Sequence, residues 1–390
     1  MERSKSTIAF VWIVLMVALS GITLWNLAYA TSAKNAVEKA GFRERLHGML
    51  LANCAFHDEM IHLYGGWALA SGRSVCNGVI RASNGVLVNT RMPIIDTGVK
   101  AKCLKSLYYK LKGSGRGFLY VQLPLKIDCH GTMLPCGFAR DHSHEIIDGF
   151  LKTLDSFQVP FVDVRGILDS TPDDVQRYFF STDHHWNFDG AFKVFPTIAR
   201  ALVESLGAKS ADIAPYISPD EWERKKLPRR FLGTDGRRTG ALFAGTDEIF
   251  YYVPKFKTEI SRVVDRRKIS VNGSFVDSVL NGQSAEKPIS MFLDTGYGIY
   301  GGDFDHVKYT NCVAPIKKNV LIVKDSYALP IIAWLTTIFE RVDVVDLRYF
   351  KKMTLVAAVG TFKSDGVAIM YNPGSIAVNK MWQIGSVSAL

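Results

Sequence analysis

A serine, a histidine and an aspartate stand at two places in the sequence where helices are predicted to begin. Asp183 and His185 belong to the run Ser181-Thr-Asp-His-His-Trp, so a single turn can bring a carboxylate to an imidazole. A serine nucleophile needs such a base, and the base needs an acid that orients it. The run Asn319-Val-Leu-Ile-Val-Lys-Asp-Ser-Tyr-Ala supplies the serine, Ser326, directly after an apolar strand. The predicted chemistry is acyl transfer.

The position of Ser326 favours this chemistry. A helix that begins there directs its backbone N–H groups and its dipole at negative charge near the hydroxyl. A developing oxyanion needs preorganised donors, and the N–H of the serine itself is one of them. The alternative is an ordinary helix N-cap, which is a common role for serine. The Asp183 and His185 pair is what favours the nucleophile.

Three other interpretations concern the same turn. His184 is expected to make a structural hydrogen bond or to lie at the surface, with a second polar contact in the site as the alternative. Trp186 is expected in the core, with a wall of the acceptor site as the alternative. A metal site built from Asp183, His184 and His185 is disfavoured, because adjacent histidines point apart and no further ligand follows at helical spacing. We therefore predict no metal.

The two motifs together carry a resemblance. Thr182-Asp-His-His-Trp followed by Lys324-Asp-Ser-Tyr-Ala resembles the DHHW family of bacterial envelope proteins, which is itself similar to the alginate acetyltransferase group of SGNH hydrolases. The resemblance implies an SGNH-like fold in which Asp183 is the orienting acid, His185 the base and Ser326 the nucleophile. Weaker motifs in the same order extend it over most of the chain after residue 33: Leu63-Tyr-Gly-Gly, Asn84-Gly-Val-Leu, Phe231-Leu-Gly-Thr, Asp247-Glu-Ile-Phe-Tyr-Tyr and Gly298-Ile-Tyr-Gly-Gly.

The sequence departs from the SGNH pattern around the oxyanion. Lys324 stands where the usual Gly-Asp-Ser has its glycine, and the sequence has no Gly-x-Asn-Asp block. Gly301 and Gly302 are candidates to offer a backbone N–H, and Tyr371 with Asn372 are candidates to donate from a strand end. Both pairs are equally typical of turns.

Two arginine pairs flank Gly233-Thr-Asp-Gly, namely Arg229 with Arg230 and Arg237 with Arg238. Arginines bind carboxylates of an anionic sugar through bidentate contacts, which makes Arg237 a candidate substrate residue. A solvated surface is the commoner role of such a run. The net charge of +10 is compatible with an acidic polymer partner, with a membrane surface, or with a solvated basic exterior. No arginine-rich tract with interleaved aromatics indicates nucleic acid.

The elements that must position these residues alternate along the chain. Apolar runs predict strands at 118–123, 161–164, 319–323, 342–346 and 367–371. Helical patterns lie at 144–156, 188–206 and 326–340, the second of them capped by Asn187 and ended by Gly207. The alternation predicts an α/β fold with a parallel sheet covered by helices on both faces. Parallel sheets gather their active-site loops at the carboxyl edge.

We predict three regions along the 390 residues. Residues 1–33 are a cytoplasmic stub and membrane anchor, 34–110 a helical lead-in, and 111–390 an SGNH-like catalytic domain. Within that domain, about 209–317 is a β- and loop-rich insertion that borders the site, since loops on a rigid scaffold usually hold specificity.

The anchor prediction rests on residues 6–33, which carry no charged side chain, and on the apolar run from Ile8 to Trp25. A transmembrane helix needs roughly 20 such residues. The alternative is a cleavable signal peptide ending at Ala28-Tyr-Ala, but its apolar part should be only about 7–15 residues long. Basic residues on both sides leave the orientation open. We expect a single-pass membrane protein with its catalytic domain outside the cytoplasm.

Six cysteines, without paired CxxC spacing, are compatible with disulfides in that compartment. Cys129 and Cys136 bracket a short loop with glycine and proline and are predicted to pair, with free thiols as the alternative.

These observations favour an O-acetyltransferase that acts on a cell-surface or exported polysaccharide through an acyl-serine. No cytoplasmic cofactor fits outside the membrane, so the acetyl group is expected from a multispanning membrane acyl-transfer protein. The alternatives are a polysaccharide esterase or deacetylase with the same triad, and a non-catalytic glycan-binding assembly protein of the envelope.

Overall fold

The computed structural model describes residues 56–89, 92, 94–138, 141–288, 290–350, 353–378 and 382, together with the isolated positions 14, 17, 20 and 21. The predicted anchor, residues 6–33, thus lies outside the described residues apart from those four positions. Among the helices within these ranges, none has both the length and the apolar character to cross a membrane.

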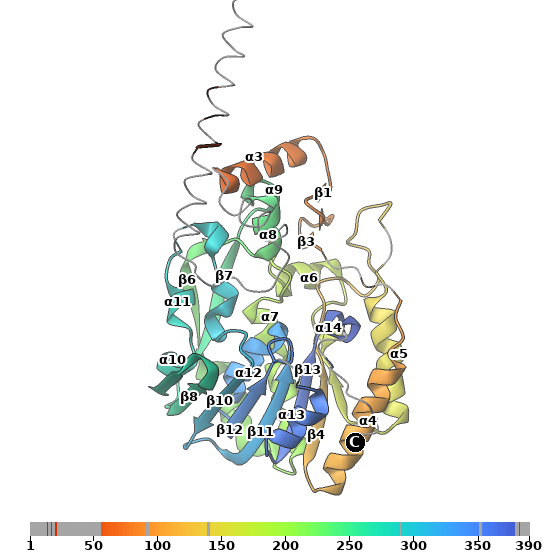
Figure 1. Ribbon diagram of the computed structural model, residues 1–390, viewed down its shortest axis with the longest axis vertical. Coiled ribbons are helices and arrows are strands. Elements are labelled where there is room, and N and C mark those ends of the chain that lie inside the picture. Colours follow the sequence, from red (N-terminus) through yellow and green to blue (C-terminus); the bar gives the residue numbers. More distant parts are fainter. Residues whose placement is uncertain are drawn as a thin grey trace, which may run out of the picture.

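The described residues build an eight-stranded sheet with the order β5-β4-β13-β11-β12-β10-β8-β9 (Figure 1). Its parallel part comprises β5 (Phe161–Asp163), β4 (Gly117–Gln122), β13 (Gly366–Tyr371), β11 (Ile316–Lys324) and β12 (Phe339–Val345). These are the five strands that the apolar runs predict. The prediction of a purely parallel sheet is wrong, however, because three antiparallel strands extend one edge: β10 (His306–Asn311), β8 (Ile260–Val264) and β9 (Ile269–Gly273).

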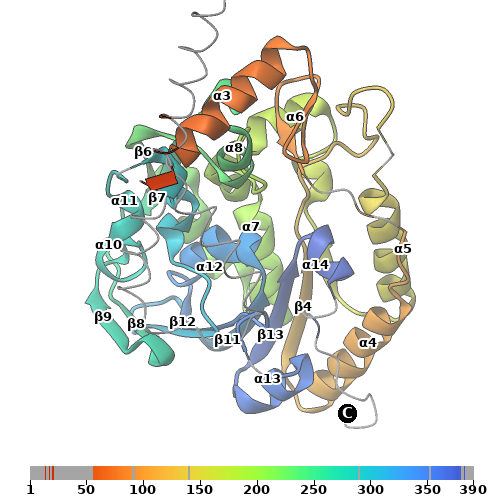
Figure 2. The same ribbon diagram turned by 45° about the horizontal axis from the view of Figure 1, so that its top comes forward.

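Strands β4 and β13 and the later parts of β11 and β12 are buried because helices cover both faces of the sheet there, whereas β5 at the edge is partly exposed. All six residues of β13 are buried, and successive side chains point to opposite faces. Val367, Ile369 and Tyr371 pack with α4 (Gly98–Gly113), α5 (Ser143–Ser156) and α13 (Leu355–Thr361). Ala368 and Met370 pack on the other face with α7 (Phe188–Ser205) and α12 (Leu329–Leu335). Figure 2 shows α4 and α5 side by side along the β4 edge.

The predicted helices are found, with one difference. Asn187 caps α7 by accepting a hydrogen bond from the Gly190 N–H at 2.8 Å, as its place in the sequence indicates. The third predicted helix is shorter than 326–340. It consists of a 3-10 turn, η7 (Ser326–Ala328), followed by α12, because the chain enters β12 at Phe339.

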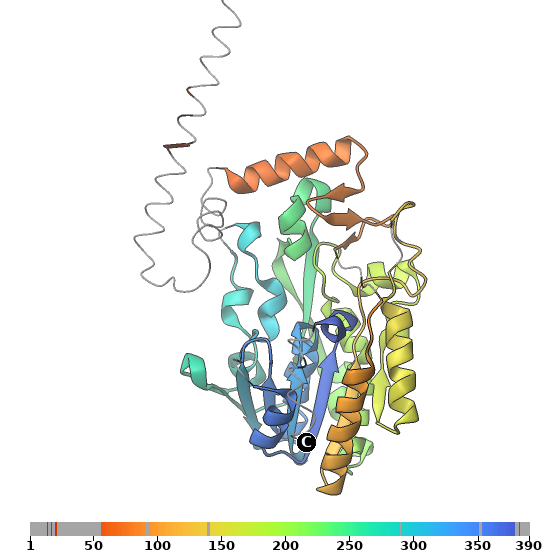
Figure 3. The ribbon, with the colours of Figure 1, turned by 45° about the vertical axis from the view of Figure 1, so that its right-hand side comes forward.

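The remaining elements surround the carboxyl end of the sheet. Helix α3 (His57–Ala70) lies across one end of the molecule over α8 (Thr234–Thr239) and α9 (Ala241–Ala244), as Figures 1 and 3 both show. A long hairpin pairs β6 (Trp222–Phe231) with β7 (Asp247–Pro254). The smaller elements are β1 (Val75–Cys76), β2 (Val79–Arg81), β3 (Leu87–Val88), α6 (Pro172–Tyr178), α10 (Phe275–Ser278), α11 (Gly282–Ala285), η6 (Gly296–Tyr300) and α14 (Pro373–Ala377).

The predicted disulfide is wrong in this structure, which has Cys129 and Cys136 as free thiols. The Cys129 Sγ lies 3.2 Å from the carbonyl oxygen of Ser170, to which it donates, while Cys136 is exposed. The loop between them therefore forms without a covalent closure.

Candidate active site

Ser326 lies in the turn that leaves β11 at the carboxyl edge of the sheet, where parallel α/β sheets place their functional loops. The buried Asp325 fixes this turn. Its Oδ1 accepts from the Tyr327 N–H at 2.9 Å, and its Oδ2 accepts from the Asn372 N–H at 2.7 Å and from the Ser375 hydroxyl at 2.6 Å. One carboxylate thus ties the serine turn to the end of β13.

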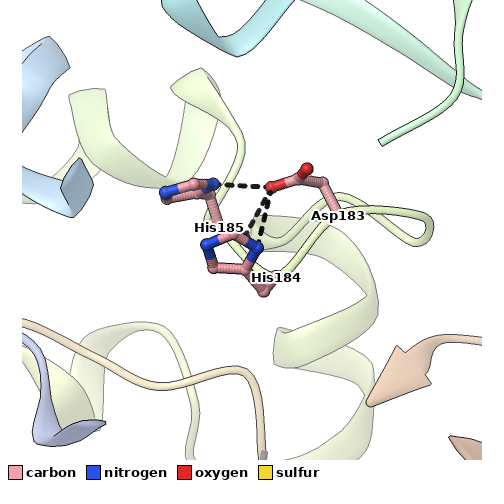
Figure 4. A group of neighbouring side chains, drawn as sticks. All are labelled: Asp183, His184 and His185. Atoms are coloured by element: carbon pink, nitrogen blue, oxygen red, sulfur yellow. Dashed lines mark hydrogen bonds and ion pairs between the residues drawn. The ribbon is translucent and has the colours of Figure 1, made fainter. Parts of the chain in front are cut away.

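Asp183, His185 and Ser326, which lie up to 143 residues apart, form a continuous chain of hydrogen bonds. The His185 Nδ1 lies 2.6 Å from the Asp183 Oδ1, and the His185 Nε2 lies 2.8 Å from the Ser326 Oγ. Figure 4 shows the Asp183 carboxylate facing the His185 ring. The arrangement has the geometry of a serine triad: a hydroxyl, a base within reach of it, and an acid that orients the base.

The buried carboxylate of Asp183 is stabilised as an anion. Burial alone would raise its pKa, but the charge and the hydrogen bond of His185 hold that pKa well below the usual range. The Thr234 N–H, at the start of α8, also donates to the Asp183 Oδ2 at 2.7 Å. Asp183 therefore remains an acceptor that orients the imidazole and favours its charged form.

Two aromatic residues hold the histidine turn and the serine turn together. The His185 ring stacks on Tyr297 with centroids 3.7 Å apart and planes 13° apart. The Tyr297 hydroxyl donates to the Ser326 carbonyl oxygen at 3.2 Å, and the Trp186 Nε1 donates to the Tyr327 carbonyl oxygen at 2.9 Å. Trp186 is fully buried, which agrees with the core interpretation and not with an acceptor wall. Tyr297 was missed in the sequence, where only its place beside the Gly298-Ile-Tyr-Gly-Gly motif marks it.

His184 lies beside this chain, and the rings of His184 and His185 are 3.8 Å apart between centroids. Each of Asp183, His184 and His185 offers a ligand atom within 4.8 Å of the others, which is the spacing of a metal site. The Asp183 oxygens, however, already accept from His185 and Thr234, and the His185 Nε2 already faces Ser326. A cation would have to displace these bonds, so the donor set does not fit a resident metal.

Replacing His184 by alanine is expected to have a mild effect. Burial, together with the neighbouring His185, lowers the pKa of His184 to about 4, so this ring is neutral in neutral solution. We expect kcat/KM to fall by less than about ten-fold and the pH profile above about pH 5 to keep its shape, because general acid–base groups contribute far more. The test is the pH dependence of aryl acetate turnover. A loss comparable to that of His185→Ala would contradict this assignment.

Asp183, His185 and Ser326 line a pocket of about 300 Å³. Gly302 and Arg237 line it, as predicted, while Gly301, at a φ of 100°, is not among the described residues that do. Two predicted residues are placed elsewhere. Tyr371 points into the core on the α4 and α5 face, and the Asn372 Oδ1 caps α14 by accepting from the Ser375 N–H at 3.0 Å. Neither Tyr371 nor Asn372 is among the described residues that line the pocket.

The arginine pairs have mainly structural contacts. Arg229 forms a buried ion pair with Asp294, and Arg230 pairs at the surface with Glu248. The Arg238 guanidinium donates to the Asn77 carbonyl oxygen at 3.0 Å. Arg237 lines the pocket while its Nη1 donates to the Asp294 carbonyl oxygen, so it is the member of the four that is placed to meet a substrate.

Lys324, the residue that departs from the SGNH pattern, forms a buried charge network behind Ser326. Only 1% of its side chain is exposed, and its Nζ pairs with Asp303 and, at 3.1 Å, with Asp346. Arg348 completes the network by pairing with the same two carboxylates at 3.2 and 2.6 Å. Because Asp303 and Arg348 line the pocket and Asp303 directly follows Gly302, the network fixes this part of the pocket wall.

Replacing Lys324 by methionine is expected to destabilise the fold by about 3 kcal/mol, since it leaves buried carboxylates with one cation fewer. The matched control on the same strand is Lys318→Met. Lys318 pairs with Asp365 at 3.6 Å in an exposed position, and such pairs contribute about 0–1 kcal/mol. Urea unfolding of both variants measures the difference. Equal free energies of unfolding would refute a structural role for the network.

Comparisons with known proteins agree with this geometry. A family model described as the SGNH hydrolase-like domain of the acetyltransferase AlgX matches residues 98–230, a range that includes Asp183 and His185. No curated protein matched the sequence. The solved structure of Bacillus cereus PatB1 is similar with a TM-score of 0.64 and 20% identity, over 78% of this chain and 99% of that one. A second PatB1 structure carries a sulfonyl adduct, with a TM-score of 0.61 and 19% identity over 78% and 96%.

A DHHW family protein from Eubacterium siraeum is similar with a TM-score of 0.58 and 20% identity, over 79% of this chain and 95% of that one. At such identities the structural matches establish the fold. The resemblance inferred from the two motifs is thereby confirmed: residues 98–230 match the SGNH hydrolase-like acetyltransferase model, and the chain is similar in fold to PatB1 and to a DHHW family protein.

Proposed function

We propose that the protein transfers an acetyl group to a hydroxyl of a polysaccharide through an acyl-Ser326 intermediate. The observation that carries the proposal is the hydrogen-bonded chain from Asp183 through His185 to Ser326, which ends in an open pocket. The resemblance of the protein to alginate-modifying acetyltransferases supports a polysaccharide acceptor. The acetyl donor, on this proposal, is a multispanning membrane acyl-transfer protein.

The reaction proceeds in two balanced halves. The His185 Nε2 takes the proton of Ser326 while the Oγ attacks the acetyl carbonyl, and the leaving group then takes that proton. In the second half, a sugar hydroxyl loses its proton to His185 and attacks the acyl-serine. Ser326 departs with the proton, and the sugar ester is formed. The backbone N–H groups of Ser326 and Gly302 are the proposed donors to the oxyanion of each tetrahedral intermediate.

The surface beside Ser326 supports a polymeric acceptor. A second cavity of about 310 Å³ is lined by Arg266, Arg267, Phe304, Asp305 and Tyr349, and it shares Asp303 with the first. Arg266 pairs with Asp305 at 3.1 Å, which leaves Arg267 as the guanidinium more available to a substrate. Aromatic rings and guanidinium groups bind sugar faces and carboxylates, respectively. Further sugar units of a chain bound at Ser326 have room to lie there.

Product masses distinguish transfer from hydrolysis. The full chain is incubated with an aryl acetate, with and without neutral and uronic acid oligosaccharides. We expect oligosaccharides that gain the mass of one acetyl group, and slower release of free acetate when an acceptor is present. Acetate as the sole product, with every acceptor unmodified, would favour the esterase. Turnover of neither kind would leave the glycan-binding protein as the better description.

A further inference from the structure

The outer face of α3 is apolar and exposed. Four large side chains, Met60, Leu63, Tyr64 and Trp67, recur at the spacing of one helical stripe, with Leu63 69% and Trp67 52% exposed, and the exposed Phe56 directly precedes the helix. Leu242 of α9, which is 57% exposed and in contact with Gly66, extends the stripe. A soluble surface rarely gathers so many large apolar side chains in one place.

The opposite face of α3 is fixed to the domain, so the orientation of the stripe is determined. Gly65 lies against α8 so closely that a Cβ there would meet the Thr239 carbonyl oxygen at 1.9 Å. The His62 Nδ1 accepts from the Ala241 N–H at 3.0 Å. Figures 1 and 3 show α3 spread across the end of the molecule, with α8 and α9 beneath it. The apolar stripe therefore faces away from the domain.

We propose that this stripe of α3 lies in the interface of a lipid bilayer and seats the domain on the membrane. The sequence argues for lipid, because the apolar run that ends at Trp25 precedes the helix by only 31 residues, 26 to 56. Tyrosine and tryptophan among aliphatic side chains are typical of helices that lie in the head-group region. The Arg73 guanidinium lies 4.3 Å from the centre of the Trp67 ring, where a lipid phosphate can pair with it.

If α3 lies on the membrane, the position of the pocket relative to the bilayer follows from the contacts of α8. Helix α8 contacts α3 through Thr239 at its last turn, and its first residue, Thr234, holds Asp183. Six residues of helix span about 9 Å. The candidate triad is thus separated from the proposed bilayer surface by α8 and by the thickness of α3, together about 20 Å, on the side of the domain that faces a donor residing in the membrane.

Tryptophan quenching by lipid tests the proposal without any measurement of activity. The full chain and its Trp67→Phe variant are reconstituted in vesicles of phosphatidylglycerol and phosphatidylcholine, with or without bromine near the head-group end of the acyl chains. The difference between the two emission spectra isolates Trp67 and cancels the other tryptophans. We expect bromine to lower the Trp67 emission at least about two-fold, since interfacial helices lie about 5–10 Å deep.

A matched control places an exposed indole elsewhere. Tyr109 is an exposed aromatic residue on α4, far from α3 in Figure 2, and Tyr109→Trp is made in the Trp67→Phe background. Its emission should be insensitive to bromine. Trp67 emission that bromine leaves unchanged would overturn the proposal. If acrylamide then quenches Trp67, the stripe faces water; if it does not, protein covers it, whether residues 34–55, a second copy or a partner. All of these outcomes leave the proposed reaction at Ser326 untouched.

Discussion

Replacing Ser326 by alanine is expected to lower acetyl transfer and aryl acetate hydrolysis by roughly three or more orders of magnitude, with the fold retained. The reason is that the variant has no group to form the acyl intermediate, while the pocket and the Asp183 to His185 hydrogen bond persist. His185→Ala should cost about as much, because without the base the hydroxyl is not activated. Residues of a triad act as a unit, so the double variant should be little worse than either single one.

A sulfonyl fluoride probe, which reacts with an activated serine hydroxyl, gives a second measurement that does not depend on the acceptor. The wild type should gain one adduct, located at Ser326 by peptide mass. Ser326→Ala should gain none, and His185→Ala should react much more slowly. The control is Ser170→Ala, which removes a hydroxyl that only bonds the Gly166 carbonyl oxygen and should change neither reading. Full turnover in a folded Ser326→Ala protein would refute the nucleophile.

The strands and the serine turn were predictable because they depend on local sequence. Strands β4 and β13 and the later part of β11 are buried on both faces, so their residues form continuous apolar runs, and the run in β11 ends at Val323, just before the turn of Ser326. The Asp-x-His spacing is local too, since a carboxylate two residues before an imidazole reaches it within one turn, as the 2.6 Å contact shows. Asn187 marks the start of α7 by a side-chain cap that needs no tertiary contact.

The sequence-based predictions failed for residues and strands whose positions depend on tertiary contacts. Tyr371 and Asn372 end a strand at the correct edge of the sheet, but alternation along β13 turns Tyr371 to the far face with Val367 and Ile369. The antiparallel strands β8, β9 and β10 carry half-polar patterns, since parts of their faces are exposed. They join the sheet through β10, which pairs with β12, while β8 pairs with β10 and β9 with β8. Tyr297 reaches His185 from 112 residues away, and no local pattern encodes such a stacking contact.

Gly233 is a further residue that the sequence marked only as part of the weak motif Phe231-Leu-Gly-Thr. The structure explains why glycine stands there. A Cβ at this position would lie 2.2 Å from the Cβ of Asp183 and 2.6 Å from its Cα. The backbone at φ −71° and ψ −177° is one that any residue adopts, so the need for glycine comes from this contact alone. The next residue, Thr234, then donates its N–H to the Asp183 carboxylate.

Replacing Gly233 by alanine is therefore expected to displace Asp183 and to lower kcat by about a hundred-fold or more, with a smaller effect on KM. A displaced Asp183 leaves the His185 imidazole wrongly oriented. Removal of the acid from a serine triad lowers kcat strongly even when the histidine and the serine remain. Steady-state kinetics with an aryl acetate measure both constants, and thermal unfolding shows whether the variant is folded. Gly149→Ala is the control, because no atom lies within 4 Å of a Cβ at that position on α5.

Thr234→Pro tests the same contact if Gly233→Ala does not fold. Proline is tolerated at the first position of a helix, where α8 has Thr234, and it removes the N–H that Asp183 accepts. It also removes the Thr234 hydroxyl, which accepts a long hydrogen bond of 3.3 Å from Arg237. A lost hydrogen bond to a charged acceptor costs about 1.5–3 kcal/mol, so we expect the free energy of unfolding to fall by about that amount near neutral pH. The pH dependence follows from Asp183, whose pKa is lower in the folded protein than in the unfolded chain. The stability that the Asp183 carboxylate contributes is therefore present above its pKa in the unfolded chain and is lost as the pH falls through its folded pKa. The difference between Thr234→Pro and the wild type should therefore shrink in acid. A folded Gly233→Ala enzyme with full kcat, or a Thr234→Pro variant whose stability deficit does not change with pH, would show that α8 does not position the acid.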